Sequence, residues 1–202
     1  MLSARDIDED YVKSAKIVYA TGITQSISIS AQEAVLKMFQ VAKENNVTVA
    51  FDPNFDPLLW SKEEAKDGFN QIEDYIDILF LNLKSDSLAL WDIESVDKLI
   101  ELFLDRGIKT VVLKSKNKSG YYVANASETL FVPFYSDVKV DSTGAGDAFN
   151  GAFLHSVAEG KSIFESAKFA AVVSGLQVRG VGAIKSIPSL KEVSEAMREQ
   201  NG

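Results

Sequence analysis

The chain has 202 residues, of which 46% are apolar and 25% are charged, a globular composition long enough to bury a sizeable core. It contains no cysteine and a single histidine, His155, which excludes disulfide frameworks, zinc–thiolate sites and cysteine nucleophiles. The net charge is −8 and the acidic residues are spread along the chain, which argues against a nucleic-acid partner. Residues 1–13 do not resemble a signal peptide, and the densest apolar stretch, 75–83, is far too short to span a membrane. We therefore expect a cytoplasmic protein that binds neither nucleic acid nor membrane.

Short β-branched segments alternate with segments of helical periodicity over the first half of the chain. This pattern predicts strands at 16–21, 47–51, 78–81 and 110–114, separated by helices at 31–45, 61–75 and 95–105. Such alternation favours an α/β fold with a mostly parallel sheet and crossover helices. Residues 121–124 and 129–132 then predict an antiparallel hairpin appended to the sheet.

Three helices in succession are expected in the last third of the chain, the first of them over 148–159. Helix starts are marked by a serine followed three residues later by a glutamate, the capping-box spacing, at Ser61, Ser162 and Ser189. No internal repeat or linker interrupts the pattern. Residues 1–202 are therefore expected to form a single domain.

The segment that bears most directly on function is 141–147, Asp-Ser-Thr-Gly-Ala-Gly-Asp, which lies between a short extended segment at 138–140 and the helix. Gly144 and Gly146 allow successive backbone N–H groups to turn inward, and the helix start adds donors and the positive end of its dipole. Asp147 then stands where its carboxylate can accept a proton from a hydroxyl that attacks a phosphorus. The same residues also suit a plain strand-to-helix turn with Asp147 as a favourable first-turn carboxylate. A Walker A loop and a dinucleotide fingerprint both fail on spacing.

These residues also resemble a known family. The run 141–153, Asp-Ser-Thr-Gly-Ala-Gly-Asp-Ala-Phe-Asn-Gly-Ala-Phe, is similar to the signature of the ribokinase-like (PfkB) carbohydrate kinases. Residues 51–60 resemble a segment of fructokinases and 2-keto-3-deoxygluconate kinases, and 182–189 resemble the nucleotide-side loop of the family. The resemblance covers essentially the whole chain. It implies a ribokinase-like fold and phosphotransfer to a sugar hydroxyl that uses ATP and Mg²⁺.

The resemblance implies a role for particular residues. Asp147 would be the catalytic base, Gly144, Ala145 and Gly146 would form the anion hole, and Asp141 would order the loop. The positions implied on the nucleotide side are Asn82, Lys114, Asp141, Thr143, Ala171, Gly175, Gly182 and Ala183. Those implied on the sugar side are Asp52, Asn54, Asp56 and Asp147, and no residue is assigned as a metal ligand.

The chain departs from the family pattern in several places. The N-terminal third, with its first strands, sugar-binding segment and β lid, has no counterpart, so the strand 16–21 is expected to be an open edge that favours a homo-oligomer. Ser85 stands where the magnesium motif has glutamate, with Asp86 as a substitute one residue out of register, and Ala171 replaces an asparagine. Asp56 replaces an arginine, which disfavours an acidic sugar unless Asp56 points into its own turn.

Two functional hypotheses follow. The first is a sugar kinase for small-molecule sugar and ATP. The second is a truncated or degenerate relative that keeps the fold and nucleotide binding without phosphotransfer. A protein-interaction module has only the open sheet edge in its favour. The identity of the sugar stays open.

Overall fold

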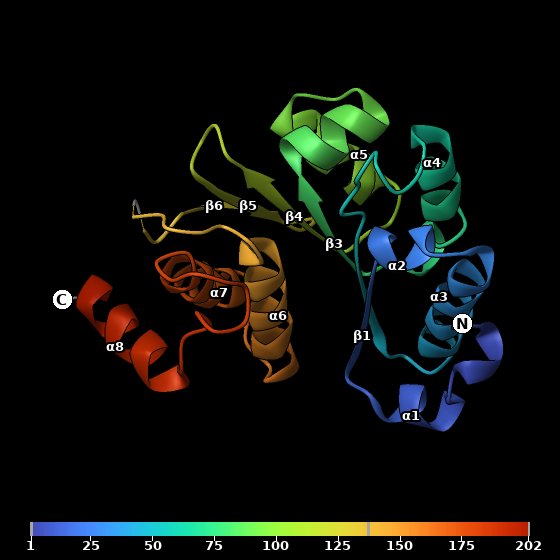
Figure 1. The fold of residues 1–202 in the computed structure, drawn as a ribbon, viewed down its shortest axis with the longest axis horizontal. Helices are drawn as coiled ribbons and strands as arrows, with labels where there is room; N and C mark the ends of the chain where they lie inside the picture. Colours follow the sequence, from blue (N-terminus) through green and yellow to red (C-terminus); the bar gives the residue numbers. More distant parts are fainter. Residues whose placement is uncertain (1, 137, 202) are drawn as a thin grey trace. The chain divides into compact units, whose positions relative to one another are not determined.

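The structure, a computed structural model, describes residues 2–136 and 138–201 and the side chains up to residue 199. Six strands form one sheet in the order β1-β2-β3-β4-β5-β6 (Figure 1). Two compact units are present. Unit 1 comprises the described residues up to Ser115 together with Ala124–Thr129, and unit 2 comprises Lys116–Val123 and the described residues from Leu130 onward. The α/β fold with a mostly parallel sheet and flanking helices is confirmed, whereas the single domain over 1–202, whose end residues lie outside the described ones, stays a prediction.

Unit 1 contains the parallel part of the sheet. β1 pairs with β2, β2 with β3 and β3 with β4, all in parallel, which confirms the predicted crossover arrangement. Its elements in chain order are η1 (Ala4–Asp6), α1 (Glu9–Ser14), β1 (Ile17–Thr21), α2 (Gly22–Ser26), α3 (Ile29–Glu44), β2 (Thr48–Asp52), α4 (Lys62–Asn70), η2 (Glu73–Tyr75), β3 (Ile78–Asn82), η3 (Leu83–Trp91), α5 (Val96–Asp105) and β4 (Thr110–Ser115).

Aromatic side chains tie the helices of unit 1 to its sheet. Phe51 of β2 meets Phe39 of α3 edge-on and Phe69 of α4 at a tilt, with ring centroids 6.2 Å apart in both pairs. Phe69 and Trp91 both meet Phe103 of α5 edge-on, at 5.8 and 5.0 Å. Large buried aromatic rings contribute much of a core's apolar area, so this chain of rings fixes the helices against β2.

Three features of unit 1 differ from the sequence prediction. The helices α1 and α2 were not predicted, since each is only five or six residues long and carries little helical periodicity. The expected helix 61–75 is divided, because α4 ends at Asn70 and the short 3₁₀-helix η2 follows. Residues 83–91 form a π-helix, η3, a rare conformation that is often found at functional sites.

Unit 2 contains the hairpin strands and three helices. The elements are β5 (Gly120–Ala124), whose last residue belongs to unit 1, β6 (Thr129–Pro133), whose first residue does too, α6 (Ala145–Ala158), α7 (Ile163–Gln177) and α8 (Leu190–Asn201). The predicted hairpin is confirmed, with the N–H of Asn125 donating to the carbonyl of Glu128 across its turn (3.0 Å). The extended segment expected at 138–140 contains no strand among its described residues.

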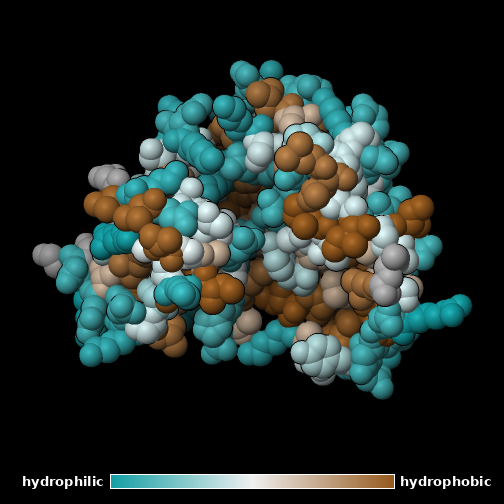
Figure 2. All heavy atoms as spheres, in the orientation of Figure 1, coloured by the Kyte–Doolittle hydropathy of each residue, from teal (hydrophilic) through white to brown (hydrophobic). Residues whose placement is uncertain are grey.

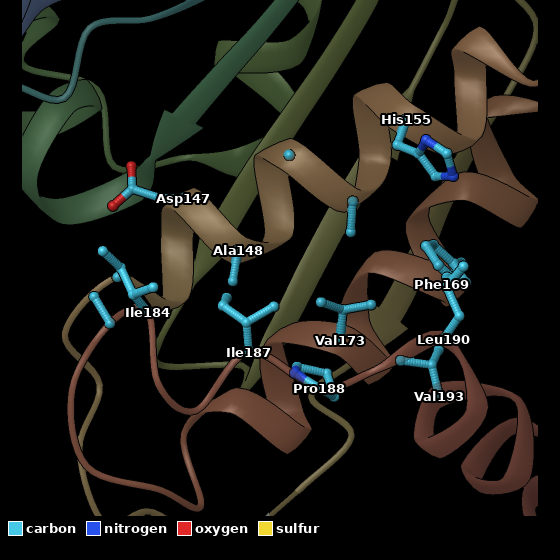
Figure 3. A pocket seen from close by; sticks show the side chains of 14 residues that line it. Asp147, Ala148, His155, Phe169, Val173, Ile184, Ile187, Pro188, Leu190 and Val193 are labelled. Atoms are coloured by element: carbon cyan, nitrogen blue, oxygen red, sulfur yellow. The ribbon is translucent and has the colours of Figure 1, made fainter.

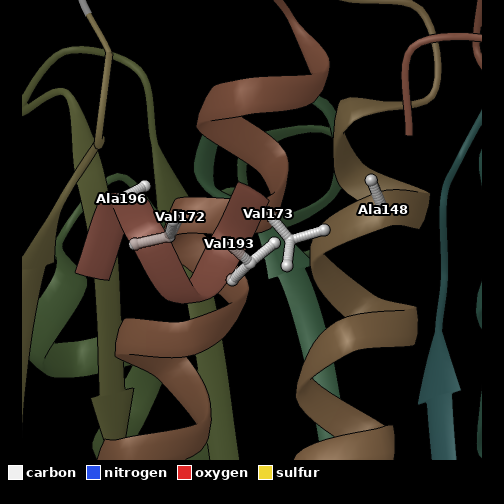
Figure 4. Close-up of a cluster of buried hydrophobic side chains, with 5 residues drawn as sticks. All are labelled: Ala148, Val172, Val173, Val193 and Ala196. Atoms are coloured by element: carbon white, nitrogen blue, oxygen red, sulfur yellow. The ribbon is translucent and has the colours of Figure 1, made fainter. Parts of the chain in front are cut away.

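A small apolar cluster joins the three helices of unit 2. It comprises Ala148 of α6, Val172 and Val173 of α7, and Val193 and Ala196 of α8 (Figure 4). The predicted capping boxes start two of the helices, since Ser162 and Glu165 exchange hydrogen bonds at α7 and Ser189 and Glu192 do so before α8. The cluster therefore packs the three helices together, and the caps fix the residues at which α7 and α8 begin.

The surface carries apolar side chains in separate patches among polar ones (Figure 2). Among the large apolar residues, Leu58 (91%) and Ile184 (87%) have the largest exposed fractions, and they lie in different units. In the part of the chain that the structure describes, none of the helices combines the length and the apolar character needed to cross a bilayer.

Candidate functional site

The loop 141–147 leads directly into helix α6. Gly144 is the N-cap of α6 and has a φ of +77°, a left-handed conformation that glycine adopts without strain. The N–H of Ala145 donates to the carbonyl of Ser142 (3.2 Å). Within the described residues, the N–H groups of Gly144, Gly146 and Asp147 have no assigned acceptor. Unpaired donors at the positive end of a helix suit an anion, and we call these three N–H groups, with the loop 141–147 that carries them, the cradle.

Asp147 lies in the first turn of α6, beside these donors. Its side chain is exposed, and its carboxylate points away from the apolar residues that follow it on α6 and α7 (Figure 3). One helix turn therefore presents both hydrogen-bond donors for an anion and a carboxylate that can accept a proton. Assignment of these residues as a catalytic base and an anion hole stays a prediction.

Asp141 holds the loop in shape. Its Oδ1 accepts the N–H of Thr143 (2.9 Å) and its Oδ2 accepts the N–H of Gly182 (3.0 Å). These two backbone hydrogen bonds, with further help from the Thr143 side chain, lower the pKa of Asp141 below its ordinary value of 3.8. The carboxylate therefore connects the cradle to the loop that carries Gly182 and Ala183.

Residues at the end of helix α7 form hydrogen bonds with the backbone of the loop and of the first turn of α6. The Oγ of Ser174 donates to the carbonyl of Ala145 (2.9 Å), and the carbonyl of Val178 accepts the N–H groups of Val140 (2.8 Å) and Asp141 (3.2 Å). Ser174 is buried, at 4% exposure. The sequence reasoning missed Ser174, for which the available signal was a serine within the apolar run 169–176.

Two predicted nucleotide-side residues of α7 are buried in unit 2. Ala171 is 3% exposed, and Gly175 is also buried. A Cβ added at Gly175 would stand 2.6 Å from the Cβ of Tyr135, so that side of the helix is covered by Tyr135. Gly182 and Ala183 are half-buried and lie beside the cradle, where a Cβ on Gly144 would meet Ala183. Nucleotide binding by these residues stays a prediction.

A cavity of about 550 Å³ adjoins the cradle within unit 2. Asp147 lies at one end of the labelled group in Figure 3 and His155 at the other. The remaining lining is apolar or glycine, and its labelled members are Ala148, Phe169, Val173, Ile184, Ile187, Pro188, Leu190 and Val193. His155, for which the sequence suggested no role, is therefore part of the cavity wall.

In unit 1, predicted site residues stand at the carboxyl ends of the parallel strands. Asp52 is the last residue of β2 and Asn82 the last of β3, and Lys114 on β4 is the register partner of Asn82. Ligands of open α/β sheets bind at this edge. The sheet therefore brings Asn82 and Lys114 side by side, while their role on the nucleotide side stays a prediction.

The loop after β2 is built from its own polar side chains. The Oδ1 of Asp52 accepts the N–H of Asn54 (2.9 Å), which has a left-handed φ of +39°. The Oδ1 of Asp56 accepts the N–H of Leu58 (2.9 Å), so Asp56 does point into its own turn. The charge argument against an acidic sugar therefore loses its premise, because it required this carboxylate to face the sugar.

The carboxylate of Asp86 connects the loop after β2 to the end of β3. Its carboxylate is 1% exposed and accepts the N–H groups of Phe55 (2.9 Å) and Asn82 (2.6 Å). Burial raises the pKa of Asp86 to about 6. Both oxygens of Asp86 thus accept backbone N–H groups, and the expectation that Asp86 replaces a magnesium-motif glutamate stays a prediction. Asn82 in turn caps η3, its Oδ1 accepting the N–H groups of Lys84 and Ser85.

Comparisons with known proteins identify a matching family and several similar proteins. Residues 2–190 match the model described as pfkB family carbohydrate kinase. The ATP-dependent 6-phosphofructokinase of Thermoanaerobacterium thermosaccharolyticum is 30% identical over 90% of this chain and 56% of its own, and fructokinase-1 of Zea mays is 30% identical over 98% and 64%. A putative ribokinase II from E. coli, solved in complex with ATP and Mg²⁺, superposes with a TM-score of 0.87 at 26% identity over 98% of this chain and 63% of that one. The chain thus spans somewhat under two thirds of the length of these proteins.

Proposed function

Because the chain belongs to the pfkB family of carbohydrate kinases, we propose that it acts in ATP-dependent phosphoryl transfer to a hydroxyl group of a sugar. The observation that carries the proposal is the first turn of α6, where the unpaired N–H groups of Gly146 and Asp147 stand beside the exposed carboxylate of Asp147. The donors suit a phosphoryl group, and the carboxylate suits the proton of the attacking hydroxyl.

In the proposed reaction, Asp147 accepts the proton of the sugar hydroxyl. The hydroxyl oxygen then forms a bond to the γ-phosphorus of ATP while the bond from that phosphorus to the β–γ bridging oxygen breaks, and ADP leaves with the bonding electron pair. The N–H groups of the cradle donate to the oxygens of the transferred group, on which negative charge is concentrated. Asp141 contributes by keeping the loop in the shape that presents those donors.

Mg²⁺ belongs to this proposal as part of the ATP complex. No group of three or more His, Cys, Asp or Glu residues among the described ones could hold a metal ion. Mg²⁺ commonly binds through few protein ligands and several phosphate and water oxygens, which is compatible with this arrangement. When bound to ATP, it would neutralise charge on the phosphates.

On the sugar side, we propose Asp52 and Asn54 at the carboxyl end of β2 as hydroxyl-binding residues. Both carry polar groups suited to sugar hydroxyls, and both stand in a loop fixed by the hydrogen bond from the N–H of Asn54 to Asp52. Asp56 has one oxygen committed to its own turn and stays the weaker candidate.

A second candidate function is nucleotide or phosphate binding without transfer. It is favoured by the inward carboxylate of Asp86, whose oxygens accept the N–H groups of Phe55 and Asn82. The two candidates differ in turnover but share the cradle.

The deciding experiment measures ATP binding and sugar-dependent ADP release on the same protein. If the proposed function holds, Asp147→Asn lowers kcat by roughly 10²–10⁴, the usual contribution of a general base, while ATP still binds. Asp105→Asn, which removes an exposed carboxylate from α5, should leave both measurements unchanged. A loss below about threefold in Asp147→Asn would remove Asp147 from the role of base. ATP binding with no turnover on any neutral or acidic sugar would favour the second candidate.

We also propose self-association through β1. This strand stands at one end of the sheet order, with β2 on its one paired side among the described residues. Open strand edges recruit further strands, so a homo-oligomer is expected. Sedimentation that shows only monomer at tens of micromolar would count against this proposal.

A further inference from the structure

Gln177, the last residue of α7, is a fully buried polar side chain in unit 2. It is 0% exposed. Its Nε2 donates to the carbonyl of Thr143 (2.9 Å) and to the Oγ of Ser186 (3.1 Å). Its Oε1 has no hydrogen-bond partner among the described residues. One amide nitrogen therefore joins the cradle to the loop before α8.

The other end of this connection returns to the cradle. The Oγ of Ser186 donates to the carbonyl of Gly182, whose N–H donates to Asp141 (3.0 Å). Asp141 in turn accepts the N–H of Thr143 (2.9 Å). Gln177, Ser186, Gly182, Asp141 and Thr143 thus form a closed ring of hydrogen bonds around the two loops.

The contact with Thr143 has a directional consequence. A trans peptide is planar and its C=O and N–H point in opposite directions, so fixing the carbonyl of Thr143 toward α7 turns the N–H of Gly144 away from it. Ser174 does the same two peptides further on, where its bond to the carbonyl of Ala145 turns the N–H of Gly146 away from α7. Both N–H groups lack an assigned acceptor within the described residues.

We propose that Gln177 is a positioning residue of the phosphate cradle, acting through the carbonyl of Thr143 to aim the N–H of Gly144 at the bound phosphate. The inference rests on the proposed function for the identity of the anion, but the loop conformation can be measured without it. A purely packing role does not account for the donor geometry, because the side chain satisfies its nitrogen while leaving its own oxygen unpaired in the interior.

The test replaces Gln177 by Met, which has similar length and no N–H donor. Ser166→Ala is the matched control, because Ser166 is also 0% exposed, lies on the same helix, and has an Oγ without a partner among the described residues. Hydrogen exchange in the peptide 140–147 should rise about tenfold or more in Gln177→Met, and the Kd for ATP should rise about tenfold, the effect of losing one aligned donor. Ser166→Ala should change neither by more than about twofold.

Each outcome decides a separate question. Unchanged exchange and ATP affinity in a folded Gln177→Met variant would overturn the positioning role. A wild-type chain that does not bind ATP would overturn the proposed function, while the exchange measurement would still decide the role of Gln177. If Gln177→Met does not fold, the same two measurements on Gln177→Leu decide, because leucine is apolar, shorter than glutamine and offers no donor to Thr143. Where KM for ATP can be measured, it should rise while KM for the sugar stays unchanged.

Discussion

Gly144→Ala tests whether the cradle depends on this backbone position. Two costs add at the site. A side chain at the left-handed φ of +77° costs about 1–2 kcal/mol, and the new Cβ would stand 2.6 Å from the Cβ of Ala183, an overlap that costs about 1–3 kcal/mol more. The expected loss is therefore about 3 kcal/mol in the free energy of unfolding, or roughly 10 °C in Tm for a chain of this size.

Two other glycines separate these costs. Gly160 has a φ of +82° but nothing within 4 Å of an added Cβ, so Gly160→Ala should lose only the conformational part, about 1–2 kcal/mol. Gly146 lies within α6 with the same open space, so Gly146→Ala should be neutral or stabilising by up to about 1 kcal/mol. Combining Gly144→Ala with Ala183→Gly removes the overlapping methyl and should recover about 1–2 kcal/mol.

Urea unfolding followed by far-UV circular dichroism gives the four free energies, and ATP titration of the same proteins reports on the cradle. The reasoning fails if Gly144→Ala and Gly160→Ala lose equal stability, or if Ala183→Gly recovers nothing. It also fails if Gly144→Ala binds ATP as tightly as the wild type, because the N-cap conformation would then be irrelevant to the donors.

Three further variants are compared by urea unfolding. Burial acts to raise the pKa of Asp77, but the ion pair with Lys109 and a hydrogen bond from a backbone N–H outweigh burial and lower the pKa. The stability of the wild type should therefore fall as the pH drops below about 4. Asp77→Asn should lose about 1–3 kcal/mol in the free energy of unfolding at neutral pH and show a smaller fall at acidic pH. Burial raises the pKa of Asp86 from 3.8 to about 6, so the stability that its protonated form contributes is lost as the pH rises from about 4 to about 6. If Asp86→Asn shows the same change of unfolding free energy with pH in this range as the wild type, the raised pKa is refuted. Gly175→Ala should lose about 1–3 kcal/mol in the free energy of unfolding, because the new Cβ would overlap the side chain of Tyr135. An unchanged free energy would show that this face of α7 is open.

The parallel sheet could be predicted because its strands carry an unambiguous signal. Val49, Ala50 and Phe51 are buried on both faces of β2, as expected for an inner parallel strand, and helix α4, which follows, is marked by a capping box. The π-helix could not be predicted in the same way. It is set by Asn82 at its start and by the buried carboxylate of Asp86, and neither contact leaves a periodic pattern in the sequence.

The cradle was predicted from its glycines, but its supports were not. Gly144 and Asp147 stand where the sequence placed them, at the start of α6. Gln177 and Ser174 escaped prediction because their partners are backbone carbonyls, which every residue possesses, so sequence spacing cannot identify the contact. Gly175 shows the converse, since its small size serves the approach of Tyr135, which is distant in sequence.

The hydrogen bonds that shape the cradle all come from residues 140–186, a continuous stretch that supplies both the loop and its supports. The strand-end residues proposed for the sugar, Asp52 and Asn54, belong to a different part of the chain. The loop proposed for the phosphate, with its supports, is therefore separate in sequence from the residues proposed for the sugar hydroxyls, although Asn82 and Lys114, implied on the nucleotide side, also precede residue 115. Grafting 140–186 between relatives should transfer that loop together with all of its supporting hydrogen bonds, while the residues proposed for the sugar stay those of the recipient chain.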